Sequence, residues 1–228
     1  MLNKKTAIII PVYNEGQVIE SVASDVLNEY QTVICVDDGS SDNSITEIQK
    51  TGALLVKHPI NMGQGAALQT GMEYALHHTE AEFFVTFDAD GQHRLQDVGV
   101  MVEELEKDEA DIVLGSRFLG EAENIPKAKK ILLKAAVRFT NFFSGIELTD
   151  THNGLRAFNR DFARQLEITM PDMAHASEII DKISSGDWRY KEVPITIKYT
   201  EYSIAKGQSM FNAVNILFDI MLARIFKK

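Results

Sequence analysis

The sequence predicts an α/β protein with a mostly parallel central sheet and helices on both of its faces. Short apolar runs alternate with segments of helical periodicity between Thr6 and Gly115, which is the pattern of strands joined by helical crossovers. The runs contain few polar residues, as expected of strands buried on both faces. Polar clusters follow three of the runs. Because parallel sheets bind ligands where their strands end, we expect the three clusters to meet at one edge.

The strands of the first half are predicted from apolar runs bounded by turn residues. They cover residues 6–12, 32–36, 53–57, 83–87 and 111–115. Apolar residues spaced three and four positions apart predict the helices between them. These helices cover residues 17–30, 43–50, 63–78 and 97–107.

The second half is less regular. A helix is predicted over residues 126–145, and a polar loop that begins at residue 149 leads into a short strand ending near residue 159. Apolar residues alternate over residues 190–199, and Pro194 lies among them. Because proline cannot donate a hydrogen bond to a neighbouring strand, this segment is predicted to be an edge strand.

Residues 210–228 have the pattern of an amphipathic helix, in which Asn212, Asn215 and Asp219 share one face. Asp219 and Arg224 argue against a helix that spans a bilayer. We therefore expect residues 1–209 to form one domain and residues 210–228 to form a C-terminal helix. That helix lies on a membrane surface, docks to a small membrane protein or a second copy of the chain, or closes the protein's own core.

The predicted helix over residues 126–145 carries a basic face. Lys127, Lys130, Lys134 and Arg138 are spaced three and four residues apart, and no acidic residue lies among them. Side chains at this spacing lie on one side of a helix. The face is either simply solvated or a surface for anionic lipid head groups.

The composition excludes several classes of protein. The formal net charge of -10 disfavours extended contact with nucleic acid. The single cysteine, Cys35, lies in an apolar run and cannot support a disulfide framework, which fits a reducing cytosol. Neither an apolar stretch long enough to span a bilayer nor a signal-peptide pattern is visible. We therefore expect a cytoplasmic protein.

Gly63 and Gly65 invite comparison with the dinucleotide-binding motif G-x-G-x-x-G. Leu68 occupies the third glycine position, and the motif follows the third predicted strand rather than the first, so a Rossmann NAD site is disfavoured. The backbone N–H group of Gly65 can still approach an anion at a helix start. The sequence contains no Walker motif, no G-x-S-x-G motif and no Cys/His metal cluster.

Two acids follow the most apolar of the predicted strands. Asp88 and Asp90 come directly after residues 83–87 and precede a glycine. Paired carboxylates at the end of a buried strand repel each other and resist desolvation, so a divalent cation such as Mg²⁺ or Mn²⁺ is the expected neutralising ligand. Such an ion keeps open positions for phosphate oxygens. The alternative is a solvated loop whose acids only end the strand.

Asp37 and Asp38 end the second strand and suit a ribose or a base. Together with the metal–diphosphate site suggested by Asp88 and Asp90, they describe a nucleoside-diphosphate site. The motifs of the whole chain resemble those of family 2 glycosyltransferases with the GT-A fold, and in particular the dolichyl-phosphate-mannose-synthase-like, polyprenyl-phosphate glycosyltransferase branch. The resemblance rests on residues 10–15, 36–42, 61–65, 88–93, 115–118 and 206–209.

The resemblance implies a role for each matching residue on the donor side. The base and ribose of a nucleoside-diphosphate sugar, a UDP-sugar by expectation, would be held by Pro11, Tyr13, Glu15, Asp37 and Asp38. Asp88 would face the ribose and the diphosphate, and Asp90 and Gln92 would complete the metal site with it. Lys206 would close over the phosphates from a mobile polar loop over residues 203–209.

On the acceptor side, the resemblance implies that Arg117 meets the acceptor phosphate, with Arg138 assisting from the basic face. The expected reaction inverts the anomeric carbon and transfers the sugar to polyprenyl phosphate, such as undecaprenyl phosphate, for cell-surface polysaccharide modification. The phosphate is already ionised and needs no general base. The protein would then lie peripherally on the inner face of the cell membrane.

Two other functions remain open from the sequence. A transferase that adds a sugar to a hydroxyl of a lipid-linked oligosaccharide would need a carboxylate base, and Asp150 is the candidate in the predicted polar loop. A nucleotide-sugar-binding subunit without catalysis is the second. The intact set Asp88, Asp90, Gln92 and Arg117 argues against it, because a cluster of buried charges is costly to keep.

Overall fold

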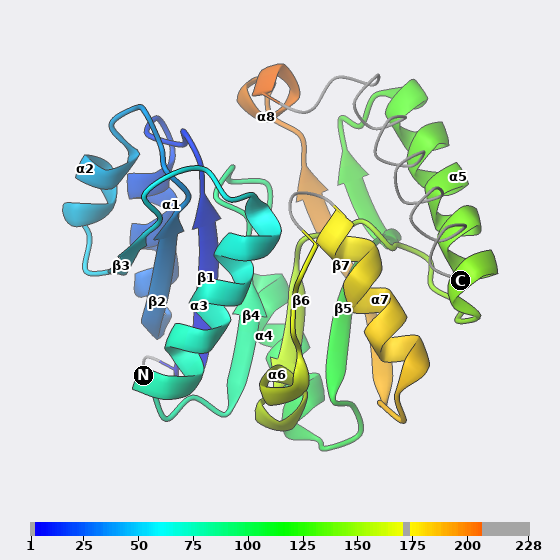
Figure 1. The fold of residues 1–228 in the computed structure, drawn as a ribbon. Coiled ribbons are helices and arrows are strands. Elements are labelled where there is room, and N and C mark those ends of the chain that lie inside the picture. Colours follow the sequence, from blue (N-terminus) through cyan, green and yellow to red (C-terminus); the bar gives the residue numbers. More distant parts are fainter. Residues whose placement is uncertain (1–2, 171–173, 207–228) are drawn as a thin grey trace.

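A seven-stranded sheet in the order β3-β2-β1-β4-β6-β5-β7 runs through the computed structural model, which describes residues 3–170 and 174–206 (Figure 1). The strands are β1 (Asn3–Val12), β2 (Tyr30–Asp37), β3 (Leu54–Lys57), β4 (Phe83–Thr86), β5 (Ile112–Glu123), β6 (Arg156–Asn159) and β7 (Tyr190–Lys198). The helices are α1 (Ile19–Leu27), α2 (Ser44–Gln49), α3 (Gln64–His78), α4 (Leu95–Glu106), α5 (Lys127–Ser144), α6 (Arg160–Gln165), α7 (His175–Ser185) and α8 (Glu201–Lys206).

The sheet is parallel except at β6, which confirms the predicted class. β6 lies antiparallel between β4 and β5, with Arg156 opposite Thr86 on one side and Leu114 on the other. Because β6 runs against its neighbours, its first residue lies at the edge where the parallel strands end. The loop before β6 therefore reaches the same edge as the loops after β1, β2 and β4.

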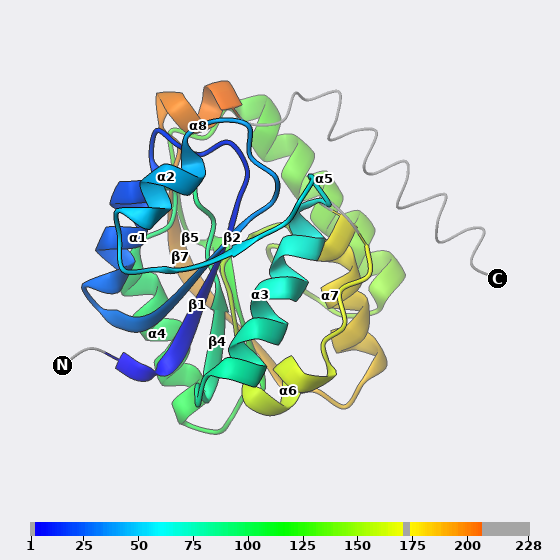
Figure 2. The same ribbon diagram turned by 60° about the vertical axis from the view of Figure 1, so that its left-hand side comes forward.

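Helices cover both faces of the sheet, as predicted (Figure 1, Figure 2). Successive side chains of a strand point to opposite faces, so Ile8 and Ile10 pack with apolar residues of α1 and α4, whereas Ala7 and Ile9 pack with α3, α6 and α7. Cys35 is buried in the first of these two layers, and burial raises the pKa of its thiol to about 12. It is a core residue, as expected.

The structure corrects several predicted boundaries. The helix predicted over residues 17–30 ends at Leu27, because the chain turns and enters β2 at Tyr30. The strand predicted to stop at residue 115 continues to Glu123, with an interruption in its pairing to β7 between Ser116 and Glu121. Helices α6 and α7 were not predicted.

The remaining elements of the second half agree with the sequence more closely. α5 occupies the predicted helix and ends where Gly145 adopts a left-handed conformation with φ of 73°, and β7 is an edge strand. The polar segment predicted as a loop from residue 203 begins instead within α8. The helix predicted over residues 210–228 lies outside the described residues. Within residues 3–170 and 174–206, no helix has the length and hydrophobicity needed to cross a bilayer.

Candidate active site

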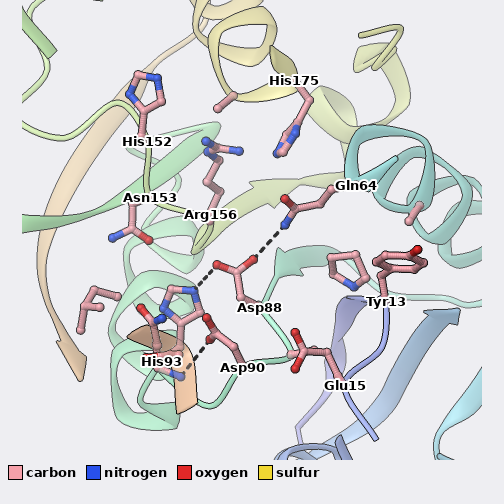
Figure 3. A pocket seen from close by; sticks show the side chains of 18 of the residues that line it. Tyr13, Glu15, Gln64, Asp88, Asp90, His93, His152, Asn153, Arg156 and His175 are labelled. Atoms are coloured by element: carbon pink, nitrogen blue, oxygen red, sulfur yellow. Dashed lines mark hydrogen bonds and ion pairs between the residues drawn. The ribbon is translucent and has the colours of Figure 1, made fainter. Parts of the chain in front are cut away.

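A pocket of about 490 Å³ opens at the edge of the sheet where β1, β2 and β4 end (Figure 3). Its walls come from these strand ends, from the loop before β6 and from α5 and α7. Most of the side chains predicted from the sequence line it, namely Pro11, Tyr13, Glu15, Asp38, Asp88, Asp90, Gln92 and Arg117. The predicted convergence of three polar clusters at one edge is therefore observed.

Asp38 organises one end of the pocket. Its carboxylate accepts hydrogen bonds from the backbone N–H groups of Met62 and Gly63, both at 2.8 Å, and lies 2.7 Å from Nδ1 of His58. These contacts hold the turn that starts α3 against the end of β2. The neighbouring Asp37 does not line the pocket, and its buried Oδ1 has no hydrogen-bond partner among the described residues.

Asp88 is held from two sides at the end of β4. Gln64 Nε2 donates to its Oδ1 at 3.2 Å, and Nε2 of His93 lies 3.0 Å from its Oδ2 (Figure 3). Gly154 lies so close that a Cβ atom there would be 2.2 Å from Asp88 Oδ2, so any larger residue at this point would displace the Asp88 carboxylate from its present position. Asp88 is thus fixed between α3, the loop after β4 and the loop before β6.

The two acids of the D-x-D pair have different affinities for a proton. Burial raises the pKa of Asp88, but the hydrogen bond and charge of His93, together with the charge of Arg156, outweigh it and lower the pKa. Burial and the neighbouring charge of Asp88 raise the pKa of Asp90 to about 6. Both carboxylates are therefore ionised at neutral pH and repel each other, which favours a bound cation.

The residues at this point fit a hard divalent ion that completes its coordination with substrate. Asp88, Asp90 and Gln92 all line the pocket, and Asp90 Oδ1 accepts from the Gln92 backbone N–H at 3.1 Å. No group of three or more His, Cys, Asp and Glu side chains in the described part of the chain could hold a metal alone. Mg²⁺ commonly uses one or two carboxylates together with phosphate oxygens, which matches this set.

Arg117 lies in the interruption of β5. Ser116 pairs with Pro194 and Glu121 with Thr196, so the residues between them loop out of the ladder in a bulge that redirects their side chains. Arg117 Nε donates to Asp150 Oδ2 at 2.6 Å, Nη1 to the Tyr199 hydroxyl at 2.8 Å, and Nη2 to the His152 carbonyl at 2.9 Å. The Arg117 side chain is only 8% exposed, and these contacts fix its guanidinium.

Asp150 has no access to the pocket. It is 3% exposed, its Oδ2 also accepts from the Arg117 backbone N–H at 3.1 Å, and its Oδ1 accepts from the His152 N–H at 3.3 Å. The carboxylate that the sequence offered as a base for a hydroxyl acceptor is therefore a buried partner of Arg117.

Comparison with known proteins identifies the family of the chain. Residues 7–167 match the family model described as Glycosyl transferase family 2. The chain belongs to glycosyltransferase family 2. It is 30% identical to the UDP-N-acetylglucosamine--dolichyl-phosphate N-acetylglucosaminyltransferase of Methanococcus voltae, over 100% of this chain and 99% of that protein. It is 26% identical to the polyprenol monophosphomannose synthase of Mycolicibacterium smegmatis, over 89% of this chain and 81% of that one.

Solved structures identify the fold of this family 2 glycosyltransferase as GT-A. The glucosyl-3-phosphoglycerate synthase of Mycobacterium tuberculosis, crystallised with Mn²⁺, UDP-glucose and phosphoglyceric acid, superposes with a TM-score of 0.75 and 16% identity. The match covers 96% of this chain and 78% of the synthase.

The basic residue that α5 contributes to the pocket of this glycosyltransferase is Lys129 and not the predicted Arg138. Arg138 is exposed and does not line the pocket. Lys129 does, with Nζ 4.7 Å from the centre of the Tyr199 ring, and burial, followed by the charge of Arg117, lowers its pKa. Leu132, Leu133 and Ala136 line the pocket with it. Their spacing from Lys129 is the signal that could have identified this face of the helix.

The loop before β6 and the start of α7 supply residues that the sequence analysis missed. His152, Asn153, Arg156 and His175 all line the pocket (Figure 3). Burial lowers the pKa of His152 to about 4, so its ring is neutral at physiological pH. Burial also lowers the pKa of Arg156 to about 10, which leaves it charged.

Of the other predicted residues, Gly65 is buried in the first turn of α3 and does not line the pocket. The side chain of Lys206 lies outside the described residues. α8, which carries this residue, is tied to the loop after β1, because the Tyr202 hydroxyl donates to Glu15 Oε2 at 2.7 Å. Ser203 of α8 lines the pocket beside it.

Proposed function

We propose that this glycosyltransferase moves a sugar from a UDP-sugar to polyprenyl phosphate with inversion at the anomeric carbon and with help from Mg²⁺ or Mn²⁺. The proposal rests on a pocket that has an anionic end and a cationic end. Asp88 and Asp90 form an anionic end suited to a metal–diphosphate, and Arg117 and Lys129 form a cationic end suited to a second phosphate. Relatives named for transfer to dolichyl phosphate and polyprenol phosphate support the same acceptor.

On the donor side, the base and ribose would be held by the pocket residues Pro11, Tyr13, Glu15 and Asp38, with Asp37 buried behind them. Asp88, Asp90 and Gln92 would hold the metal, which supplies positive charge to the departing diphosphate when bound. Lys206 would add a further positive charge from the end of α8. The full-length relative from M. voltae, whose name specifies UDP-N-acetylglucosamine, supports UDP as the nucleotide.

On the acceptor side, Arg117 and Lys129 would hold a phosphate oxygen near the anomeric carbon. Tyr199 connects the two cations, since its hydroxyl accepts from Arg117 and its ring lies under Lys129. A phosphate oxygen is already deprotonated, so the attack needs no general base. The engagement of both Asp150 oxygens by the protein's own N–H groups favours this acceptor over a sugar hydroxyl, which would need a base.

The outer face of α5 supports membrane contact. Ile131 and Phe142 are 71% and 81% exposed on this helix, and the basic face predicted from the sequence is also exposed: Lys127, Lys130, Lys134 and Arg138. Apolar side chains beside cations suit an anionic bilayer surface. We propose that α5, together with residues 210–228, places the protein on the inner face of the cell membrane, where it supplies lipid-linked sugar for cell-surface polysaccharide.

The test is transfer of radiolabelled sugar from a panel of UDP- and GDP-sugars to undecaprenyl phosphate in detergent. We expect an organic-extractable product with Mn²⁺ or Mg²⁺, its loss in EDTA, and its loss in Asp90→Asn. Asp161→Asn, a change at an exposed acid of α6, is the matched control and should retain activity. Formation of lipid product in EDTA would contradict the metal, and absence of lipid product with every donor would contradict the acceptor.

A further inference from the structure

The order of strands along the sheet sets the order in which their residues line the pocket. Strands β2, β1, β4, β6 and β5 follow one another as neighbours, about 4.8 Å apart as in any sheet. Under the proposed function, on which this inference rests, β2 and β1 carry the residues for the nucleoside and β4 carries those for the metal and diphosphate. The nucleoside, diphosphate and sugar of the donor are bonded in the same order, so the sugar can reach β6, the strand next to that of Asp88.

Two hydrogen bonds hold the loop that leads into β6. Thr86 Oγ1 donates to the Gly154 carbonyl at 2.6 Å, and the Leu155 backbone N–H donates to Asn153 Oδ1 at 2.9 Å. The second contact turns the Asn153 carbonyl oxygen toward its own backbone. The amide nitrogen Nδ2 is left without a hydrogen-bond partner among the described residues, although Asn153 is only 3% exposed.

Arg156, the first residue of β6, has the same property. It is 3% exposed, and its Nη1 makes no hydrogen bond within the described part of the chain. Its backbone is paired on both sides, to Thr86 and to Leu114. Figure 3 shows the guanidinium beyond Asp88, on the side of the pocket where His152 and His175 lie. A buried N–H without a partner is costly unless a ligand or water satisfies it.

We propose that Asn153 Nδ2 and Arg156 Nη1 donate hydrogen bonds to oxygen atoms of the transferred sugar, and that they form the sugar-recognising subsite of the enzyme. Both groups are donors, both line the pocket, and both are fixed by strand β6 and the loop before it. Oxygen atoms of a hexose accept hydrogen bonds of this kind. A sugar that places an acceptor at both positions is selected over one that does not, because the latter leaves buried donors unpaired.

Two other uses of the pair lead to different measurements. Arg156 also faces the charge of Asp88, so it could serve only as a counter-ion for the metal site or as a ligand of the donor's diphosphate. In either case, changing it would weaken UDP and a UDP-sugar equally. A sugar subsite instead affects only the ligand that carries the sugar.

The experiment is calorimetric titration of the full chain with Mn²⁺ present, using UDP against UDP-N-acetylglucosamine and UDP-glucose, and GDP against GDP-mannose. Arg156→Lys keeps the positive charge near Asp88 but removes the guanidinium fork. Asn153→Ser removes the amide donor, and its hydroxyl can still accept from the Leu155 N–H. Arg160→Lys is the matched control, because the Arg160 guanidinium donates to backbone carbonyls of Leu76 and Ala81, away from the pocket.

We expect Arg156→Lys and Asn153→Ser each to raise the Kd of the sugar nucleotide by about 10- to 100-fold and to leave the Kd of the matching nucleoside diphosphate unchanged. Arg160→Lys should change neither. Equal weakening of both ligands, or no weakening of either, would overturn the sugar subsite. A wild-type chain that binds neither UDP nor GDP would overturn the proposed function itself, and this inference with it. Melting temperatures identify any variant that has not folded, and the two variants are independent of each other.

Discussion

Arg117 and Asp150 act as one unit at the scale of single residues. The guanidinium is fixed by three acceptors before any substrate arrives, and the carboxylate has no exposure of its own to the pocket. Holding the cation in place removes the cost of ordering it when a phosphate binds. We therefore assign Asp150 a positioning role.

Asp150→Asn should lower the melting temperature and raise the KM for polyprenyl phosphate by at least about tenfold, because it leaves a buried guanidinium without its counter-ion. The KM for the sugar nucleotide should change little. Steady-state kinetics with each substrate varied in turn provide the measurement. A base role predicts something else: a large fall in kcat at saturating acceptor, with no change in its KM.

His152 makes the stability of the protein depend on pH. Its folded pKa is about 4 against an ordinary value of 6.5, so between these values the unfolded state binds the proton more tightly. This contribution to stability is fully present above pH 6.5 and is lost as the pH falls toward 4. His152→Gln should therefore lose fewer degrees of melting temperature than the wild type between pH 7 and pH 4.5. Parallel melting curves for the two proteins would refute the assignment.

Only some of the pocket residues could be predicted from the sequence. Asp88 and Asp90 are visible because two acids after an apolar run are unusual, and the motif around them is distinctive. Asn153 and Arg156 also line the pocket, but they lie just before β6 and at its first position. Nothing local in the sequence states that β6 runs against its neighbours, so its leading loop was not expected at the edge where ligands bind.

At the scale of elements, α5 has one face toward the pocket and another toward the surface of the protein. One face carries Lys129 and apolar side chains into the pocket, and the other exposes Ile131, Phe142 and the basic residues. The helical period was readable in the sequence, but the assignment of faces was not, because both faces mix lysines with apolar residues. The burial of one lysine distinguishes them.

A matched set of substitutions on α5 separates the two faces. Lys129→Gln should raise the KM for a short-chain polyprenyl phosphate in detergent by about tenfold, since one charge-assisted contact to the phosphate is lost. Lys130→Gln and Arg138→Gln should leave that KM unchanged and should instead weaken binding to anionic vesicles in a sedimentation assay. If Arg138→Gln raised the KM as Lys129→Gln does, the original assignment of Arg138 from the sequence would be restored.

At the scale of the whole molecule, the sequence predicts the parallel half of the sheet well. Each strand there is an apolar run followed by a helix, so class, order and binding edge all follow from one repeated pattern. The second half of the sheet does not follow this pattern. β6 is four residues long and begins with an arginine, β5 continues through a bulge that contains Gly120, and α6 and α7 have short or mixed patterns. Only long-range pairing defines these elements.

The place of β6 has a consequence for how the chain reaches its native state. β4 and β5 precede β6 in the sequence but are hydrogen-bonded within the sheet only through it, so the sheet cannot close until residues 156–159 have been synthesised. Contacts of such long sequence separation form late, because the loop they close is costly in entropy. The strand that joins the two halves also carries Arg156 into the pocket. A ribosome-bound or truncated chain that stops short of β6 therefore has an incomplete pocket, and acquisition of activity coincides with closure of the sheet.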